Sequence, residues 1–363
     1  MKLSQRICWS VLLGSAAVAM AQEIPAPEAP ATPTPVVTAR PVATSSAAEG
    51  RMHLDVVVDD KAGKAVPGLE LKDFTLMDNN QPAPILSFHA FDATVQQAEA
   101  PAEVIVPLDV VNNEFQTISY VREGIEKFLR QNGGKLAQPV SILLFTNDGA
   151  KTVLKPTMDG NALAGQLSDM VTGMRTIGRS GGLAGDGERF ELSIRMLSLI
   201  AKTETKVPGR KLLIWAGPGW PLLNNVGIEI SNKDQQMFFD RIVLLSGLLR
   251  EAQISLYSIS SGEVGPGTFV YRGYLKGVKS SPQANPPNLA LKVLATQSGG
   301  RVLGPDNDLT AQINHIVEDA KAYYRISFDP PKADRANEYH DLKLQVDQPG
   351  LTARTNSGYY NQP

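Results

Sequence analysis

The sequence contains almost no cysteine, and this scarcity excludes several kinds of chemistry. Its 363 residues include a single cysteine, Cys8, in an N-terminal segment that we expect to be removed. The mature chain then has no thiol, which excludes disulfide bonds, catalysis by a thiolate and metal binding through cysteine. Histidine is also scarce, and no two of the four histidines have the spacing of metal ligands on a helix.

The chain also lacks an excess of charge of either sign. The formal net charge is -2, and acidic and basic residues are interspersed without a basic stripe. Aromatic residues make up only 6% of the chain, which argues against a surface on which nucleic-acid bases stack. The sequence therefore predicts no nucleic-acid partner. The hydrophobic content of 42% suits one large core, or one core with a small companion.

The first residues have the pattern of a secretory signal peptide. Lys2 and Arg6 give a positive start, Ile7–Val18 is apolar, and Ala19-Met20-Ala21 fits a small-x-small cleavage site. The apolar stretch is shorter than the roughly 20 residues that a transmembrane helix needs. We predict a signal peptide over residues 1–21, and hence a secreted, periplasmic or cell-envelope protein without a membrane span after cleavage. The alternative is an anchor that is not cleaved.

Residues 22–50 differ in composition from the rest of the chain. This segment is rich in proline, alanine and threonine, and almost none of its side chains could fill a core. Such a composition favours an extended tether. Two interpretations remain open: a stalk that holds the folded part away from a surface, or a tail that stays disordered.

Short stretches near both ends of the remaining chain are typical of strands. Residues 51–95 contain three such stretches separated by turns: His53–Val58, Phe74–Met77 and Ile85–Phe88. Residues 323–363 contain three more: Tyr324–Phe328, Leu342–Val346 and Leu351–Arg354. Neither flank is long enough to form a stable sheet pair alone. We expect the two flanks to form one small antiparallel β-sandwich, with the middle of the chain inserted between them.

Residues 102–322 alternate between strand and helix patterns. The predicted strands are Val104–Leu108, Ser141–Phe145, Lys211–Trp215 and Ile254–Ile259. The predicted helices are Ser119–Gln131, Leu163–Val171, Phe190–Ala201, Gln235–Ala252, Leu289–Thr296 and a last one that Asp308 caps and that runs to Tyr323. This alternation predicts an α/β fold with a mostly parallel, doubly wound sheet and helices on both faces. Such folds bind their ligands at the carboxyl edge of the sheet.

Four stretches share their order and spacing with a known family. They are Val66–Asp78, Val106–Asn113 with a helix that ends at Arg130, Gly209–Pro221, and Tyr323-Tyr324 with Leu351–Tyr360. On these stretches the chain resembles a family of acidobacterial secreted proteins related to von Willebrand factor type A (vWA), from about His53 to Tyr360. The resemblance implies a vWA-like domain flanked by β elements, and it implies no particular ligand.

The resemblance also implies a place for a divalent cation. Many vWA domains hold one with an Asp-x-Ser-x-Ser loop after the first strand, a threonine, and an aspartate after the fourth strand. Asp109 matches the first ligand, but Val111 replaces the first serine and offers no oxygen. Asn113 replaces the second serine, and Trp215–Pro218 contains no carboxylate. We therefore predict a degenerate metal site and no required cofactor.

Two interpretations of Asp109 remain. Its carboxylate could accept backbone N–H groups and order the loop at the strand end. Alternatively, an altered site could bind Mg²⁺ or Ca²⁺ through Asp109, Asn112 or Asn113, and Asp148, because both ions prefer oxygen ligands.

A glycine-rich segment offers an enzymatic alternative. Gly178–Gly182 matches the G-x-S-x-G pattern with Ser180 as the nucleophile, and His315 or His340 could serve as the base. That chemistry needs a strand directly before the serine, and residues 172–177 do not have a strand pattern. The simpler interpretation is a glycine-rich loop beside the sheet edge, which could also contact a ligand.

The leading hypothesis is a non-enzymatic protein-binding or adhesion-type module. Trp220 follows a predicted strand, where an exposed tryptophan would anchor a partner, or a buried one would cover the end of the core. We assign the recognition face to Asp109, Asn112, Asn113, Ser180 and Trp220. The partner is expected to be a protein. The alternatives are metal-dependent adhesion with an altered ligand set and a serine hydrolase using Ser180.

Overall fold

The middle of the chain forms alternating strands and helices because buried apolar runs alternate with amphipathic ones. The computed structural model describes residues 50–92, 102–172, 182–220, 230–260 and 271–363. Residues 47–363 form one compact unit. The segment predicted as signal peptide and most of the predicted tether therefore lie outside the described residues.

A six-stranded sheet forms the centre of this unit. Its strands lie in the order β10-β9-β8-β5-β6-β7. All neighbouring pairs are parallel except β6 and β7, which form an antiparallel hairpin. The strands are β5 (Glu103–Asp109), β6 (Lys135–Thr146), β7 (Gly149–Asp159), β8 (Lys211–Ala216), β9 (Ile254–Ile259) and β10 (Val302–Leu303).

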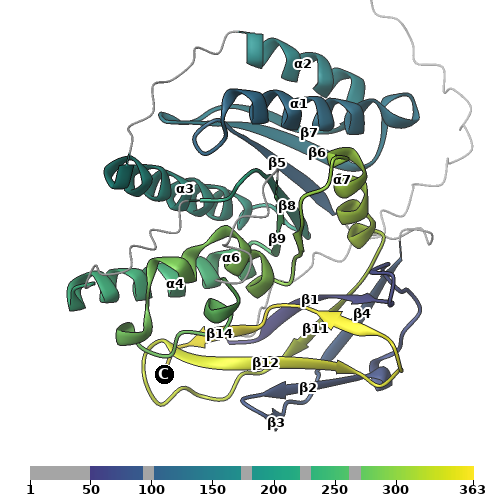
Figure 1. Ribbon diagram of the computed structural model, residues 1–363. Helices are drawn as coiled ribbons and strands as arrows, with labels where there is room; N and C mark the ends of the chain where they lie inside the picture. The colour runs from purple at the N-terminus through teal and green to yellow at the C-terminus, as the bar shows by residue number, and fades with distance from the viewer. Residues whose placement is uncertain (1–49, 93–101, 173–181, 221–229, 261–270) are drawn as a thin grey trace, which may run out of the picture. The chain divides into compact units, whose positions relative to one another are not determined.

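Helices cover the sheet on two sides. One core cluster joins α1, α2 and α7 to the sheet, and a second joins α3, α4 and α6 to it. Figure 1 shows α1 and α2 together on one side of the sheet and α3 and α4 on the other. The helices are α1 (Phe115–Arg130), α2 (Gly160–Thr172), α3 (Gly182–Glu204), α4 (Asn232–Glu251), α6 (Leu291–Gln297) and α7 (Leu309–Val317). The prediction of a mixed α/β fold around a mostly parallel sheet is confirmed.

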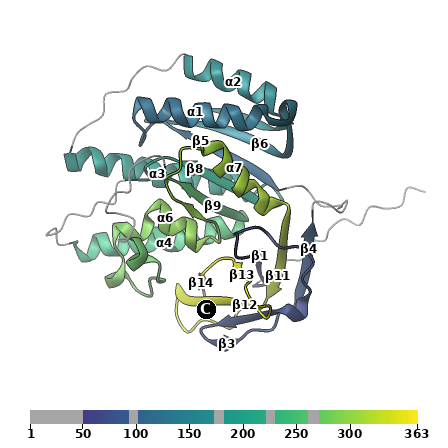
Figure 2. The same cartoon turned by 45° about the vertical axis from the view of Figure 1, so that its right-hand side comes forward.

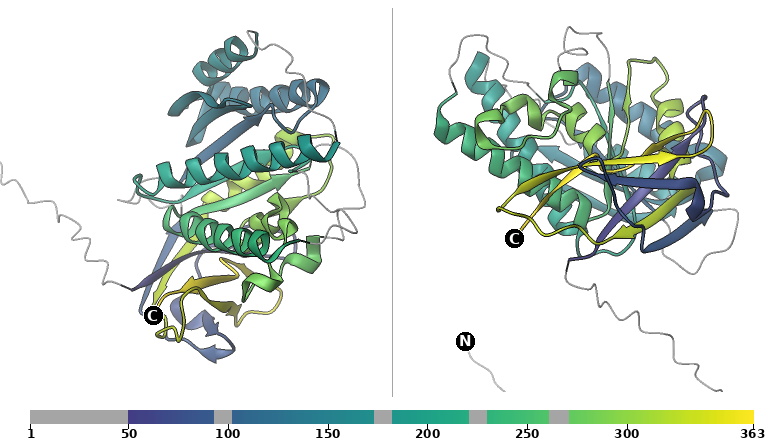
Figure 3. Two further views of the ribbon diagram at one scale, coloured as in Figure 1. Left: turned by 90° about the vertical axis from the view of Figure 1, so that its left-hand side faces the viewer. Right: turned by 90° about the horizontal axis from the view of Figure 1, so that it is seen from below.

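Two antiparallel sheets combine strands from both flanks of the chain. Their strand orders are β13-β1-β11-β4 and β14-β12-β2-β3, so each sheet contains early and late strands, as Figures 1 and 3 show in purple and yellow. Figure 2 shows the first sheet beside α7. The strands are β1 (Met52–Asp59), β2 (Phe74–Asp78), β3 (Gln81–Pro82), β4 (Ser87–Asp92), β11 (Ala322–Phe328), β12 (Glu338–Val346), β13 (Thr352–Arg354) and β14 (Gly358–Asn361).

The two antiparallel sheets, called the β region below, share a core. Leu54 and Ile326 of the first sheet belong to the same buried cluster as Leu76 and Leu342 of the second. The boundaries at residues 51–95, 102–322 and 323–363 remain predictions, since the β region and the α/β part lie in one compact unit. Short 3₁₀ helices connect elements at Leu71–Asp73, Gln131–Gly134, Tyr271–Tyr274, Ser281–Gln283, Pro286–Leu289 and Glu318–Ala320.

A buried charge network joins the β region to the amino edge of the parallel sheet. Arg301, just before β10, pairs with Asp59 of β1 at 2.5 Å and with Asp319 at 2.9 Å. Arg354 of β13 pairs with the same two carboxylates. Arg210 at the start of β8 donates to the Asp319 carbonyl. Because each carboxylate has two arginine partners, the buried charges compensate one another. Removal of one partner would leave a buried charge without full compensation.

Several sequence predictions differ from the structure, among them the start of α3, which lies at Gly182 and not at Phe190. The last helix does not run to Tyr323, because α7 ends at Val317 and β11 begins at Ala322. The strand β7 was not predicted, since Pro156 and several lysines obscure its apolar alternation. Helix α1 begins at Phe115, four residues before the predicted start at Ser119. Among the described residues, no helix is both long and apolar enough to span a membrane.

Candidate functional site

The carboxyl edge of the parallel sheet is the candidate functional site. Strands β5, β6 and β7 follow one another along the chain toward one side of the sheet. The next strand, β8, lies on the other side of β5, so the direction in which strands are added reverses between β5 and β8. Ligands of open α/β sheets bind in the crevice that forms at such a point. The β region packs at the opposite, amino edge, where β8 and β10 begin. The loop after β5 and the described residues 217–220 after β8 therefore lie at the edge opposite to the β region.

Asp109 ends β5 at this point and is fully enclosed by hydrogen-bond donors. The backbone N–H groups of Val111 and Asn112 both donate to Oδ1 at 2.9 Å. The Asn112 side-chain amide donates to Oδ2 at 2.7 Å, and the Trp215 indole N–H donates to Oδ2 at 2.9 Å. An ionised carboxylate offers about four acceptor positions, and here all of them are used. The carboxylate thus fixes the loop after β5 and ties it to β8.

The Asp109 carboxyl group has no cationic partner among the described residues. Burial raises the pKa of this carboxyl group, while the donated hydrogen bonds from Asn112, Trp215 and Val111 oppose that rise. In the part of the chain that the structure describes, none of the groups that bond to Asp109 or shift its pKa is positively charged. The centre of this edge therefore carries a buried acid stabilised by neutral donors alone.

Asn112 and Asn113 use their N–H groups and leave their oxygens unused. Asn112 donates to Asp109 and to the Ser193 hydroxyl, while Asn113 donates to the backbone carbonyls of Asp109 and Ala216. The Oδ1 atom of each asparagine is buried and accepts no hydrogen bond from the described residues. A Cβ atom on Gly217 would lie 2.8 Å from the Asn113 amide, so a glycine is needed for this close approach.

These contacts limit how the edge could bind a cation. Val111 is buried in the core beneath the loop and has no oxygen in its side chain. Asp148 lies exposed in the turn between β6 and β7. In residues 50–92, 102–172, 182–220, 230–260 and 271–363, no group of three acidic, histidine or cysteine side chains could hold a metal. Asp109 makes the contacts expected of a carboxylate that orders the loop, and binding by the predicted site residues stays a prediction.

Trp220 is buried rather than exposed. Only 4% of its surface is accessible, and its ring meets the Trp215 ring edge to face at 5.4 Å between centroids. This position agrees with the interpretation that Trp220 covers the end of the core. Its indole Nε1 is buried without a partner among the described residues.

Ser180 lies outside the described residues. Helix α2 ends at Thr172 and α3 begins at Gly182, so a helix is the last described element before this segment. The two histidines considered as its base lie in α7 and β12. His340 is hydrogen-bonded to Asp78 at 2.8 Å inside the β region, next to the hydroxyl of Tyr359.

Phe115 is a candidate that sequence reasoning missed. It is the first residue of α1, directly after the Asp109 loop, and 69% of its surface is exposed. A large aromatic side chain so exposed at a sheet edge is a suitable anchor for a protein partner. The run Asn112–Phe115, in which polar residues precede an aromatic one, could have indicated this candidate. The predicted helix start at Ser119 placed Phe115 outside the helix instead of at its first position.

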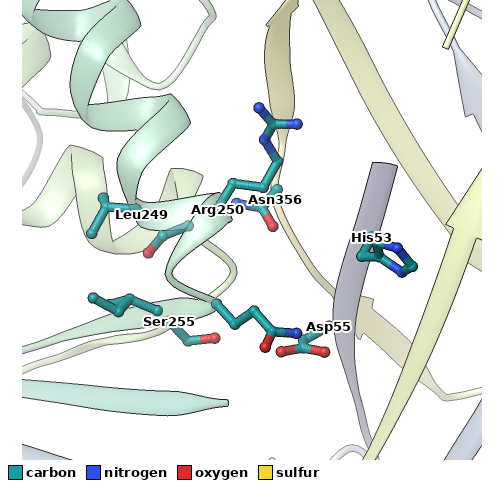
Figure 4. A pocket seen from close by; sticks show the side chains of 9 residues that line it. His53, Asp55, Leu249, Arg250, Ser255 and Asn356 are labelled. Atoms are coloured by element: carbon teal, nitrogen blue, oxygen red, sulfur yellow. The ribbon is translucent and has the colours of Figure 1, made fainter. Parts of the chain in front are cut away.

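A small cavity lies elsewhere, at the junction of the β region with the end of α4. His53 and Asp55 of β1 line it together with Arg250 and Ser255, which Figure 4 labels. The cavity has room for about one water molecule. Asp55 Oδ2 and Arg250 Nε each remain buried without a partner from the described residues. This cavity lies at the junction and is too small for a ligand larger than a water molecule.

Comparison with known proteins gives no family for the chain. No protein-family model and no curated protein matches it. Solved structures that it resembles include the human COPII-coat protein Sec24c, at 10% identity and a TM-score of 0.32 over 76% of this chain. The manganese-loaded TRAP protein of Plasmodium vivax has 9% identity and a TM-score of 0.37 over 75% of this chain. The pilus adhesin SpaC of Lactobacillus rhamnosus GG has 11% identity and a TM-score of 0.35 over 81%.

The chain spans 46% of the Sec24c chain, 97% of the TRAP chain and 48% of the SpaC chain. With scores this low, these likenesses do not assign a function. The description of the fold rests on the strand order and the two helix-covered faces.

Proposed function

We propose that the protein is a non-enzymatic, protein-binding module with a vWA-like, doubly wound domain, acting outside the cytoplasm. Its recognition face is the carboxyl edge of the parallel sheet. The expected export rests on the signal-peptide pattern of residues 1–21, and the vWA-like assignment rests on the strand order together with the sequence resemblance.

The saturated carboxylate of Asp109 is the observation that carries this proposal. A cation at this edge would need oxygens with free lone pairs. Asp109 instead accepts four hydrogen bonds from the protein itself. This saturation supports a degenerate metal site and a loop that its own hydrogen bonds order without an ion. Phe115 stands exposed beside that loop as the anchor for a partner.

Thermal unfolding with and without cations tests the metal-free part of this proposal. A ligand that binds only the native state at 100 times its Kd adds about 2.7 kcal/mol of stability. We expect the same melting temperature in EDTA, Mg²⁺, Ca²⁺ and Mn²⁺. A rise with one ion that disappears in Asp109→Ala would instead support metal-dependent adhesion through Asp109, Asn113 and Asp148.

Photo-cross-linking tests the recognition face. A benzoylphenylalanine at position 115 should form a discrete cross-linked product with a protein from the envelope fraction of the producing cell. The matched control carries the same group at Leu244 of α4, which is also exposed, at 46%, but lies away from the Asp109 loop. Products of the same kind from both positions, or from neither, would remove the carboxyl edge as the recognition face.

The hydrolase alternative is tested separately. A fluorophosphonate probe labels an activated serine covalently, so labelling that is lost in Ser180→Ala would establish an enzyme. We expect no labelling, because residues 172–177 do not have the sequence pattern of the strand that a nucleophile elbow requires directly before its serine.

A further inference from the structure

The turn between α1 and β6 contains an asparagine that two glycines follow. Asn132 and Gly133 adopt positive φ angles, of 51° and 71°. Asparagine tolerates this conformation better than most residues, and glycine adopts it without strain. Both residues are exposed to solvent, whereas Gly134 is buried. Asn132 is the only asparagine in the sequence that directly precedes a glycine.

The side chain of Asn132 differs from those of the other asparagines with positive φ. In the part of the chain that the structure describes, the Asn132 amide group makes no hydrogen bond. The comparable asparagines among the described residues each accept a hydrogen bond at 2.6–3.0 Å through Oδ1 and precede a residue with a side chain: Asn79, Asn80 and Asn337. A hydrogen bond at Oδ1 restrains the amide group. Of these four side chains, only that of Asn132 has no such restraint.

These features expose one reactive carbon. The backbone nitrogen that follows an asparagine can attack the side-chain carbonyl carbon, Cγ, and a Cβ atom on the following residue hinders that approach. Gly133 has no Cβ, and no atom lies within 4 Å of the position that one would take. Asparagine is among the thermolabile residues of proteins. Asn132 therefore combines an unrestrained Cγ with an unhindered attacking nitrogen.

We propose that Asn132 is a site of spontaneous deamidation. Hydroxide removes the proton from the Gly133 backbone nitrogen, which forms a bond to Asn132 Cγ. The Cγ–Nδ2 bond then breaks, and the amide group leaves as ammonia. One water molecule opens the resulting five-membered succinimide ring to aspartate or to isoaspartate, in which the main chain runs through the side-chain carbonyl carbon. The reaction is a hydrolysis, so it needs no oxidant, and it adds one negative charge to the chain.

The folded turn slows this reaction. At the ψ angle of 35° at Asn132, the Gly133 nitrogen lies on the opposite side of the Cα–C bond from Cβ, so ring closure requires rotation about that bond. The Lys135 backbone N–H donates to the Asn132 carbonyl. The Asn161 side-chain amide of α2 donates to the Gly133 carbonyl at 2.8 Å. Both hydrogen bonds hold the turn in its unreactive form, and Asn161 thereby protects Asn132.

The site lies apart from the recognition face. Helix α1 begins with Phe115 at the carboxyl edge and ends at Arg130, shortly before Asn132. A new negative charge at position 132 would lie at the C-terminal end of α1, where the helix dipole is already negative. The modification is therefore independent of the binding proposed at Phe115.

Peptide mapping by mass spectrometry tests the assignment on the purified chain after incubation at mildly alkaline pH. The peptide that contains Asn132 should gain the mass difference between OH and NH₂ and elute as two products, aspartate and isoaspartate. The Asn132→Asp variant supplies the reference for the aspartate form. Asn79 and Asn337 are internal controls and should react about tenfold more slowly, since a hydrogen bond of ordinary strength accounts for a factor of up to about ten in rate.

Two variants test the protection by Asn161. Asn161→Ala removes the hydrogen bond to the turn and should speed deamidation by up to about tenfold. Gln166→Ala, on the exposed side of the same helix, is the matched control and should leave the rate unchanged. No reaction at Asn132, or a reaction no faster than at Asn79 and Asn337, would overturn the proposal. Equal rates in the two variants would show that Asn161 does not protect the turn.

Discussion

At the scale of single residues, Asp109 has the unusual position of a buried acid with four donors and, in the described part of the chain, no counter-charge. The hydrogen bonds, more than the charge, require an aspartate at this position, because each carboxylate oxygen accepts two of them. An asparagine of the same shape has one acceptor fewer. If its NH₂ group took the place of Oδ1, it would face the backbone N–H groups of Val111 and Asn112. If it took the place of Oδ2, it would face the side-chain N–H groups of Asn112 and Trp215.

We therefore expect Asp109→Asn to destabilise the protein although it removes a buried charge. Leaving a buried donor unsatisfied costs about 1–3 kcal/mol. Urea unfolding followed by tryptophan fluorescence measures this cost, with Asp148→Asn at an exposed turn as the control, expected to change stability by less than about 0.5 kcal/mol. An Asp109→Asn protein as stable as the parent would mean that desolvation of the charge outweighs its hydrogen bonds.

Sequence reasoning placed Asp109 and its asparagines correctly at a strand end, since a buried run followed by polar residues marks such an end. It left open whether Trp220 is exposed, and it did not consider Phe115. Both are aromatic and both follow strands or loops, and only the packing of Trp220 against Trp215 distinguishes them. Exposure depends on contacts far apart in sequence, which local patterns do not contain.

At the scale of elements, the cap of α7 shows what a local signal can predict. Asp308 was expected to begin a helix, and its side chain accepts a hydrogen bond from the Ala311 backbone at 2.9 Å. The predicted end of that helix at Tyr323 was wrong. Helix α7 ends at Val317, and the chain continues to the buried Asp319 of the charge network. Long-range ion pairs of this kind leave no periodic signal.

The two substitutions of Asp308 should separate its cap from its charge. Asp308→Ala removes the acceptor and should cost about 1 kcal/mol, while Asp308→Asn keeps an acceptor and should cost only a few tenths. Thermal unfolding of the two variants gives the comparison. Equal losses would mean that the carboxylate acts through its charge at the helix end.

At the scale of the whole molecule, the network of Asp59, Asp319, Arg301 and Arg354 joins the β region to the α/β part. Burial alone would raise the pKa of Asp319, but the neighbouring Arg354 and Arg301 outweigh it, and the pKa lies below the ordinary value of 3.8. The folded state thus holds this carboxylate in its charged form more tightly than the unfolded chain does.

Acid should therefore weaken the junction. For a carboxyl group with a lowered pKa, the stabilisation is complete above about pH 3.8 and is lost as the pH falls through the folded-state value. Asp319→Asn should remove this part of the pH dependence and cost about 3–5 kcal/mol at neutral pH, because it leaves buried arginines undercompensated. Urea unfolding at several pH values from 6 to 2.5 measures both. Parallel pH curves for the parent and the variant would assign acid sensitivity to other groups.

The strand order of the β region also determines in which orientation the protein can be immobilised. The described chain enters through β1 and leaves through β14, and both strands belong to the region that covers the amino edge. A tag, a sensor chip or a solid support attached directly before β1 or directly after β14 would thus lie on the side remote from Phe115. Immobilised in this way, every molecule would present the same edge outward, and a dense layer of them would bind a multivalent partner through many edges at once.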